Sequence, residues 1–244
     1  MNLDKPKKLS KLTVILITLL VISILIAIVL VFVVINDIYN KNKLDDYSTV
    51  NRNNTVKWHE SEDKPIIYLY PEETLDVEVK LGNPKYLSCT YPKYENGWKV
   101  IANPGGNLID KNTGRNLYAL YWEGENIEKQ IDMSEGFCVK GEDTAKFLEE
   151  KLEILGLTER EVEEFIIYWL PKMENNKYNY IRFETLEEQN TSMPLEVTPK
   201  PDSIIRVMMD WKVLDEKIEI KEQELITSER KGFTVVEWGG SELK

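Results

Sequence analysis

The sequence predicts an α+β fold behind one N-terminal transmembrane helix. Three observations support this prediction. Residues 12–35 form an uncharged apolar run, residues 64–122 hold segments that alternate with a period of two, and residues 142–171 repeat their apolar side chains with a helical period. Strand-like segments return after the helices. Strands, then helices, then strands along one chain are typical of α+β domains.

The apolar run extends from Leu12 to Ile35 and contains 24 residues without a charge. At a rise of about 1.5 Å per residue, a helix of this length crosses a hydrocarbon core about 30 Å thick. Four lysines precede the run and Asp37 follows it. We therefore expect residues 1–11 in the cytoplasm, a signal-anchor helix in the bilayer at 12–35 and the remaining chain outside the membrane. The alternative is a cleaved signal peptide, whose apolar core is normally only about 7 to 15 residues long.

Residues 36–63 are rich in Asn, Asp and Lys and lack a sustained apolar period, so we interpret them as a flexible stalk. The extracytoplasmic domain is expected at 64–244, as one unit or as two packed subdomains, 64–140 and 141–244. Removing the first 36 residues, which hold four lysines and one aspartate, leaves 27 basic and 41 acidic residues. This negative surface argues against nucleic acid and anionic lipid as partners of the domain.

The first half of the domain has the pattern of an antiparallel β-meander. Residues 66–70 are apolar on both faces between two prolines, which is typical of a buried strand. In residues 75–81, Leu and Val alternate with charged side chains, which predicts a half-buried strand. Glycine-containing turns separate the further strands, which we expect at 86–91, 98–102 and 116–122.

The period then changes to that of a helical hairpin. Residues 142–155 place leucines on one stripe, and Gly156 follows as a helix stop. Thr158 and Glu161 form a capping box for a second helix, which we expect to end at Pro171. The hairpin is expected to pack against the sheet. Further strands are predicted at 178–184, 204–213 and 233–238.

The two cysteines, Cys89 and Cys138, would both lie outside the membrane, where disulfides are permitted. A disulfide between them would close a loop of about 49 residues and contribute roughly 4 kcal/mol by the chain-entropy estimate. The alternative is two free thiols that behave as small apolar side chains. Cys89 alternates with Leu87 and Tyr91 on what the pattern predicts to be the inward face of a strand, which suits either interpretation.

Histidine is nearly absent, because the sequence holds only His59, in the predicted stalk. A Ser-His-Asp or Cys-His catalytic arrangement is therefore disfavoured, an HExxH zinc site is excluded, and two cysteines alone make a poor structural zinc site. The segment 110–114 has the spacing of half a calcium loop, but Tyr121 stands where the final Glu should be, so a hairpin turn is the better interpretation. We expect neither a metal nor a cofactor.

Two carboxylates each stand beside a tryptophan and a glycine at a predicted strand end. Glu123 follows Trp122, and Glu237 precedes Trp238. A pair of carboxylates can cleave a glycosidic bond, and an aromatic face with acidic acceptors can hold a sugar without cutting it. The cleavage interpretation requires the two carboxyl groups to lie about 5 to 9.5 Å apart across an open cleft. In the alternative, both tryptophans cap the core and the acids bind turn amides.

Four segments of the domain read KPIIYLYP (64–71), YWEG (121–124), VKGEDT (139–144) and ERKGFTVVEWGG (229–240). They resemble segments of a family of uncharacterised bacterial proteins, mostly from low-GC Gram-positive gut bacteria. The resemblance covers residues 64 to 240 and implies an extracytoplasmic domain behind an anchor or a signal. It implies no catalytic residue, because the family has no established activity.

Together these observations predict a single-pass membrane protein whose outer domain binds a cell-envelope or host ligand, either a glycan or a protein. The anchor, the acidic exterior and the missing catalytic histidine favour binding over catalysis. The alternative is a carboxylate-dependent hydrolase acting on envelope polysaccharide, with Glu123 and Glu237 as its acid pair.

Overall fold

The computed structural model describes the backbone of residues 55–243, and their side chains except those of residues 55–60 and Gln130. The predicted cytoplasmic tail, the predicted span at 12–35 and the stalk up to residue 54 lie outside the described residues. Within the described part, no helix has the length and apolar character needed to cross a bilayer.

Two sheets and three α-helices make up the described chain. The larger sheet contains β1 (Thr55–Tyr70), β3 (Leu87–Tyr91), β7 (Leu120–Asp132), β8 (Phe137–Lys140), β9 (Tyr178–Phe183), β11 (Ser203–Leu214) and β12 (Thr234–Glu242). The smaller sheet contains β2 (Leu75–Leu81), β4 (Trp98–Ala102), β5 (Leu108–Asp110), β6 (Asn116–Leu117) and β10 (Leu195–Thr198). The helices are α2 (Thr144–Ile154), α3 (Glu159–Met173) and α4 (Leu186–Ser192).

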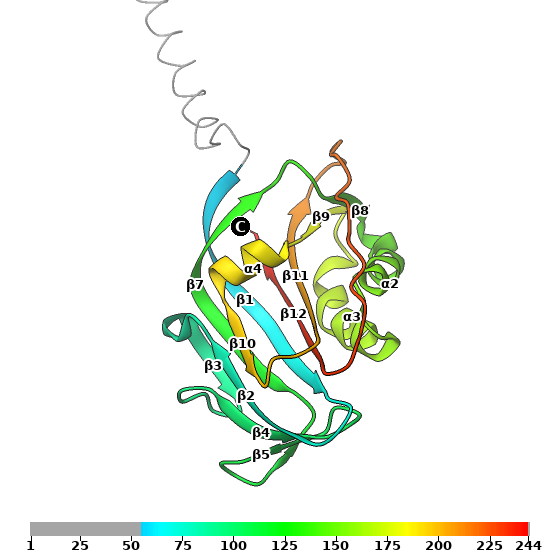
Figure 1. Cartoon of the computed structure of the whole chain (residues 1–244). Helices are drawn as coiled ribbons and strands as arrows, with labels where there is room; N and C mark the ends of the chain where they lie inside the picture. The colour runs from blue at the N-terminus through cyan, green and yellow to red at the C-terminus, as the bar shows by residue number, and fades with distance from the viewer. Residues whose placement is uncertain (1–54, 244) are drawn as a thin grey trace, which may run out of the picture. The chain divides into compact units, whose positions relative to one another are not determined.

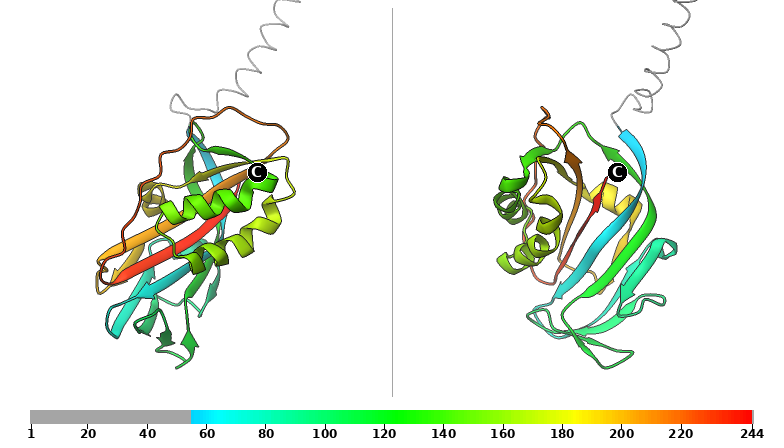
Figure 2. Two further views of the ribbon diagram at one scale, coloured as in Figure 1. Left: turned by 90° about the vertical axis from the view of Figure 1, so that its right-hand side faces the viewer. Right: turned by 180° about the vertical axis from the view of Figure 1, so that it is seen from behind.

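These elements form three layers, with the larger sheet in the middle (Figures 1 and 2). Its strand order is β3-β7-β1-β12-β11-β9-β8, and its pairs are antiparallel except for β11 and β12, which run parallel. Helices α2 and α3 cover one face, and the smaller sheet, ordered β10-β2-β4-β5-β6, packs on part of the other. The predicted α+β class is thus confirmed for the described residues.

Each face of the larger sheet carries an apolar core. Alternate side chains of β1 divide between the two cores. Ile66 packs toward the helices in one core, which we call the helix-side core, whereas Ile67 and Leu69 pack toward the smaller sheet in the other, the inter-sheet core. Both kinds of position are buried because the sheet is the middle layer, which explains why residues 66–70 are apolar on both faces.

Most predicted elements are present, but the strands of the first half do not form a single meander, because they are divided between two sheets. Strand β2 has the predicted bounds, and Val77, Val79 and Leu81 are buried as expected. Strands β2, β4, β5 and β6 do form a meander. Strand β3 does not join it, because β3 pairs with β7 in the larger sheet. The predicted strand at 116–122 is two strands, β6 and the start of β7, which lie in different sheets.

The folded part begins earlier than the sequence pattern predicts. Strand β1 starts at Thr55 and pairs with β7 from Thr55 opposite Asp132, so residues 55–63 belong to a strand and not to a stalk. His59 lies in this strand. Strands from both halves of the sequence also share the larger sheet, so the described residues form one compact unit without a boundary at residue 140.

The helical hairpin is confirmed, with one correction at its end. Thr158 accepts a hydrogen bond from the amide of Glu161, whose carboxylate accepts one from the Thr158 amide at 2.8 Å, so the predicted capping box is present. Helix α3 does not end at Pro171 but continues to Met173. Proline removes one intrahelical hydrogen bond, and the Glu174 amide still donates to the Leu170 carbonyl at 2.9 Å.

Candidate functional site

Helix α4 lies on the same side of the larger sheet as the smaller sheet (Figure 1). Buried charged side chains gather on the larger sheet beside this helix. Strand alternation explains how charged side chains reach this face. In β11, Met209 and Trp211 belong to the helix-side core, so Asp210 between them points to the opposite side. In β9, Ile181 and Phe183 also belong to the helix-side core, so Arg182 between them points to the same face as Asp210.

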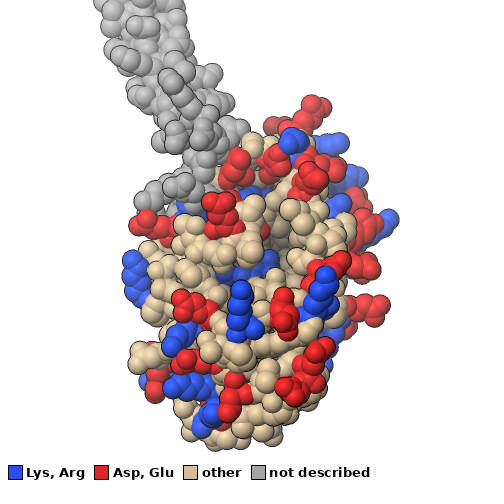
Figure 3. Space-filling model, viewed as in Figure 1, with Lys and Arg blue, Asp and Glu red and all other residues tan. Residues whose placement is uncertain are grey.

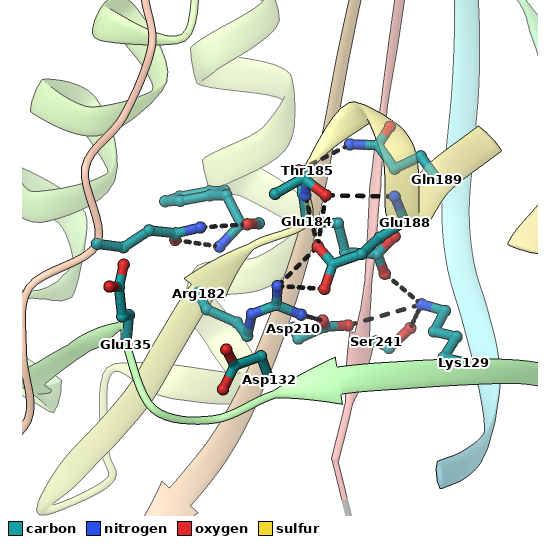
Figure 4. Close-up of polar contacts among 12 residues, drawn as sticks. Lys129, Asp132, Glu135, Arg182, Glu184, Thr185, Glu188, Gln189, Asp210 and Ser241 are labelled. Carbon is teal, nitrogen blue, oxygen red and sulfur yellow. Dashed lines mark hydrogen bonds and ion pairs between the residues drawn. The ribbon is translucent and has the colours of Figure 1, made fainter. Parts of the chain in front are cut away.

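A buried lysine lies at the centre of this region (Figure 4). The Nζ atom of Lys129 donates to Glu184 Oε1 at 2.6 Å and to Ser241 Oγ at 2.9 Å. It also forms an ion pair with Glu62 and lies 3.6 Å from Asp210 Oδ1. Burial alone would lower the pKa of Lys129, but the carboxylates around it hold the pKa well above its usual value. The ammonium therefore stays charged.

The pKa values of two acids in this cluster are raised as well, but for an acid a raised pKa favours the neutral form. Burial raises the pKa of Glu62 to about 7, although Lys129 opposes the shift. Burial also raises the pKa of Asp210 well above its usual value, against the attraction of Lys129 and Arg182. Glu62 Oε2 and Asp210 Oδ1 are buried without a hydrogen-bond partner. The cluster therefore holds more carboxylate than its two cations can fully satisfy.

Arg182 connects the cluster to α4. Its guanidinium donates to Asp210 Oδ2 at 2.9 Å and to both oxygens of Glu188 at 2.7 and 2.8 Å. Glu188 also closes a capping box on α4, because its carboxylate accepts from the Thr185 amide at 2.6 Å. Gln189 donates to the Glu184 carbonyl at 3.0 Å. A helix of only seven residues is thus attached to the sheet through the buried charges.

A pocket of about 530 Å³ opens beside this cluster, and Figure 3 shows the face that carries it. Its volume is within the range of small-molecule sites. The charged residues that line it are six acids and two cations: Glu128, Asp132, Glu135, Glu184, Glu187, Glu188, Lys129 and Arg182. The uncharged residues Ile131, Thr185, Thr191, Ser192 and Gln223 complete the lining. Lys221 lies outside this lining but pairs with Glu135, so six acids face three cations. The pocket is therefore acidic, and both cations of its lining already hold carboxylates of the protein.

Among the described residues, no group of three or more His, Cys, Asp or Glu side chains is arranged to hold a metal ion. The carboxylates of the cluster converge on the ammonium of Lys129 instead.

The acid pair nominated by the sequence is not brought together. Glu237 is fully buried on the inter-sheet side, where it accepts from Trp122 Nε1 at 2.8 Å and from Arg206 Nε at 2.6 Å. Glu123 follows Trp122 in β7 and so points to the opposite face, where it lies beside Tyr121. Burial first, and then the contact with Glu123, raises the pKa of Tyr121. Two carboxylates on opposite faces of a sheet cannot flank one glycosidic bond.

The two tryptophans are core residues and not stacking platforms. Trp122 is fully buried in the inter-sheet core, and Trp238 is fully buried in the helix-side core. Neither tryptophan therefore stands at a cleft rim, and both belong to the core as in the alternative. The other part of that alternative does not hold for Glu237, which accepts from Trp122 and Arg206 and not from turn amides. Alternation along a strand buried on both faces leaves neither ring in contact with solvent.

Cys89 and Cys138 are free thiols. They lie in β3 and β8, which are the two edge strands of the larger sheet. Six strand spacings of about 4.8 Å separate these edges, or about 29 Å along the sheet, whereas a disulfide needs Cα atoms within about 7 Å. Cys89 and Tyr91 are also exposed, which corrects the predicted inward face of this strand.

Sequence reasoning missed the Lys129 cluster, although the chain carries one signal of it. Arg182 stands between Ile181 and Phe183, and Asp210 stands between Met209 and Trp211. Charged residues with apolar neighbours on both sides are seldom buried without a partner. This pattern in the sequence indicates that Arg182 and Asp210 need partners, but it does not identify the partners.

The comparisons with known proteins identify no relative. No protein-family model matches this chain, and no curated protein or solved structure matches it significantly. The function is therefore argued from the site.

Proposed function

We propose that this chain is a single-pass membrane protein whose extracytoplasmic domain binds a basic peptide segment of a cell-envelope or host protein. The binding site is the acidic pocket beside α4. The observation that carries the proposal is the excess of carboxylates around a pocket whose own two cations are already paired.

The sequence supports the compartment in this proposal. An uncharged run of 24 residues behind four lysines favours a signal-anchor with the bulk of the chain outside. The resemblance of residues 64–240 to extracytoplasmic proteins of low-GC Gram-positive bacteria is consistent with the same topology. Outside the membrane, an acidic domain can attract cationic groups of neighbouring proteins. Nucleic acid, the main competing polyanion, is absent there.

The charge distribution of the pocket supports a cationic ligand. Lys129 pairs with Glu184, and Arg182 pairs with Glu188 and Asp210. Of these acids, Glu184 and Glu188 line the pocket and Asp210 does not. Glu187 is exposed and Asp132 is half-buried at the same pocket. A ligand ammonium that enters this partly enclosed space interacts with these carboxylates more strongly than it would in bulk water.

The same geometry favours binding over catalysis. The two acids beside the pocket whose pKa values are raised, Glu62 and Asp210, both face the ammonium of Lys129. Glu62 is only 2% exposed and is not part of the pocket wall. A general acid or base must be within hydrogen-bond reach of its substrate. Carboxylates that face a buried lysine instead serve to hold the wall of a binding site in place.

The full-length chain in detergent should bind a fluorescent trilysine peptide, measured by anisotropy, and should not bind the same peptide acetylated on its side-chain amines. Binding should weaken as salt is raised, because part of the attraction is between solvent-exposed charges. Equal binding of the acetylated peptide, or no binding of trilysine at low salt, would refute the proposed site.

Single charge removals locate the interaction. Asp132→Asn and Glu187→Gln should each weaken trilysine binding about 2- to 5-fold, the size expected for one partly exposed ion pair. Glu149→Gln removes the same charge from the exposed surface of α2 and should leave binding unchanged. If Glu149→Gln weakens binding as much as the pocket variants, the peptide responds only to net charge.

A further inference from the structure

A second pocket of about 530 Å³ lies where the end of β1 meets the start of α3. Three tyrosines and two arginines contribute to its wall: Tyr68, Tyr70, Tyr118, Arg160 and Arg230. It shares no lining residue with the acidic pocket. The chemistry of this second pocket also differs from that of the acidic pocket. Its wall is largely aromatic, and each of its arginines pairs with a glutamate.

Two tyrosines of β1 form a rigid part of this wall. Tyr68 and Tyr70 are two residues apart, so they project from the same face of the strand, and their rings stack at 6.1 Å with an interplanar angle of 3°. The Tyr68 hydroxyl donates to Glu164, and the Tyr70 hydroxyl donates to Glu161 Oε1 at 2.8 Å. Helix α3 therefore holds both rings in place.

The same two glutamates neutralise the two arginines. Arg160 Nε donates to Glu164 Oε1 at 3.0 Å, and Arg230 forms an ion pair with Glu161. The pocket therefore presents hydrogen-bonding groups without a net charge. The side chain of Arg160 remains 76% exposed, and this contact uses only one of its five N–H donors.

Tyr118 is the exposed aromatic surface of the pocket. It lies in the two-residue link between β6 and β7 and is 52% exposed. Its ring centroid is 6.3 Å from that of Tyr68, and the Arg160 guanidinium lies 6.0 Å from it. Apart from these two contacts the ring belongs to neither apolar core, and about half of the residue stays open to solvent.

The turn between β4 and β5 keeps the pocket open. Gly106 has a φ of +88°, and a Cβ atom there would lie 2.7 Å from Tyr70 Cε1. A side chain at this position would press on the tyrosine wall. The next residue, Asn107, is exposed and lines the same pocket with an amide group.

We propose that this second pocket binds a neutral carbohydrate, with a sugar ring on Tyr118 and its hydroxyls hydrogen-bonded by Arg160 and Asn107. A sugar presents an apolar C–H face to an aromatic ring and an edge of hydroxyls to amide and guanidinium groups. Because its charges are balanced, the pocket offers no net attraction to a strongly charged ligand. The site is independent of the acidic pocket and extends the proposed binding function to a second class of ligand.

The test uses the full-length chain in a sugar-free zwitterionic detergent and four neutral tetrasaccharides, built from glucose, galactose, mannose or N-acetylglucosamine. Calorimetry should detect binding of at least one of them. Tyr118→Ala should lower the association constant about tenfold because the stacking surface is lost, and Tyr118→Phe should keep it within about twofold. Arg160→Gln should lower it about 3- to 10-fold.

Tyr91→Ala is the matched control, because Tyr91 is 50% exposed but lies in β3, outside this pocket. It should bind the sugar as the wild type does. Trilysine binding of Tyr118→Ala should be unchanged, which shows that the variant is folded and separates this proposal from the function of the acidic pocket. No binding of any tetrasaccharide, wild-type affinity in Tyr118→Ala, or an equal loss in Tyr91→Ala would overturn the carbohydrate site.

Discussion

At the scale of single residues, the main feature is a cluster in which carboxylates outnumber cations away from water. Glu62 and Asp210 each keep one buried oxygen without a hydrogen bond. Removing one member of such a cluster is costly when it leaves an unpaired charge behind, and can be neutral or stabilising when it removes the excess. The direction of the effect therefore depends on which residue is replaced.

Glu62→Gln should flatten the dependence of stability on pH. The folded-state pKa of about 7 is above the ordinary 4.5, so Glu62 contributes stability that is fully present below pH 4.5 and is lost as pH rises through 7. The loss is at most about 3 kcal/mol. In urea unfolding from pH 4.5 to 8, the variant should lose less stability than the wild type, although Asp210 retains a contribution of the same sign.

The exposed Glu149→Gln is the control and should follow the wild-type profile. Parallel profiles for Glu62→Gln and the wild type would show that Glu62 is ionised in the folded protein without a penalty from burial.

At the scale of elements, α4 depends on its contacts. Isolated helices shorter than about 12 residues are marginal in water, and α4 has seven. Its capping box and the two hydrogen bonds from Arg182 Nη2 to the Glu188 carboxylate hold it against the sheet. The acidic pocket takes part of its wall from this helix, so its geometry follows the stability of α4.

Thr185→Ala should reduce global stability by about 1 kcal/mol and should also weaken trilysine binding, because the first turn of α4 loses its cap. Thr158→Ala removes the equivalent cap from α3, which does not line the acidic pocket. It should cost a similar amount of stability in urea unfolding and leave trilysine binding intact. Equal loss of binding in both variants would mean that the pocket follows overall stability and not α4.

Sequence patterns predicted elements best where the signal is local. The alternation in residues 75–81 and the capping box at Thr158 correspond to the observed β2 and α3. The short elements β5, β8, β10 and α4 were missed, since each contains no more than about two repeats of its period and no pattern builds up. Thr185 and Glu188 form a readable capping box, but no apolar stripe follows it.

At the scale of the whole molecule, the larger sheet brings together residues that are far apart in the sequence. Strand β1 lies between β7 and β12, and β12 lies beside β11. The two free cysteines are consequently placed at opposite edges, and one of them, Cys89, faces solvent. This arrangement makes Cys89 a probe of the topology proposed for the full chain.

A membrane-impermeant maleimide added to intact cells should label the full-length protein, chiefly at Cys89, since Cys138 is half-buried. Cys89→Ser should lose most of the label, and Cys138→Ser should keep it. Labelling that appears only after lysis would place the domain in the cytoplasm and would contradict the proposed orientation.

The sequence by itself determined the apolar run at 12–35, the strand and helix patterns of the domain and the presence of a single histidine, because these depend on composition and on neighbours a few residues apart. Only the tertiary structure decided that Lys129 meets Glu62, Glu184 and Asp210 and that Glu123 does not meet Glu237. These outcomes depend on strand order and on which face each strand presents. Burial of these carboxylates then raises the pKa values of Glu62 and Asp210. No local pattern in the chain shows which side chains will be buried together.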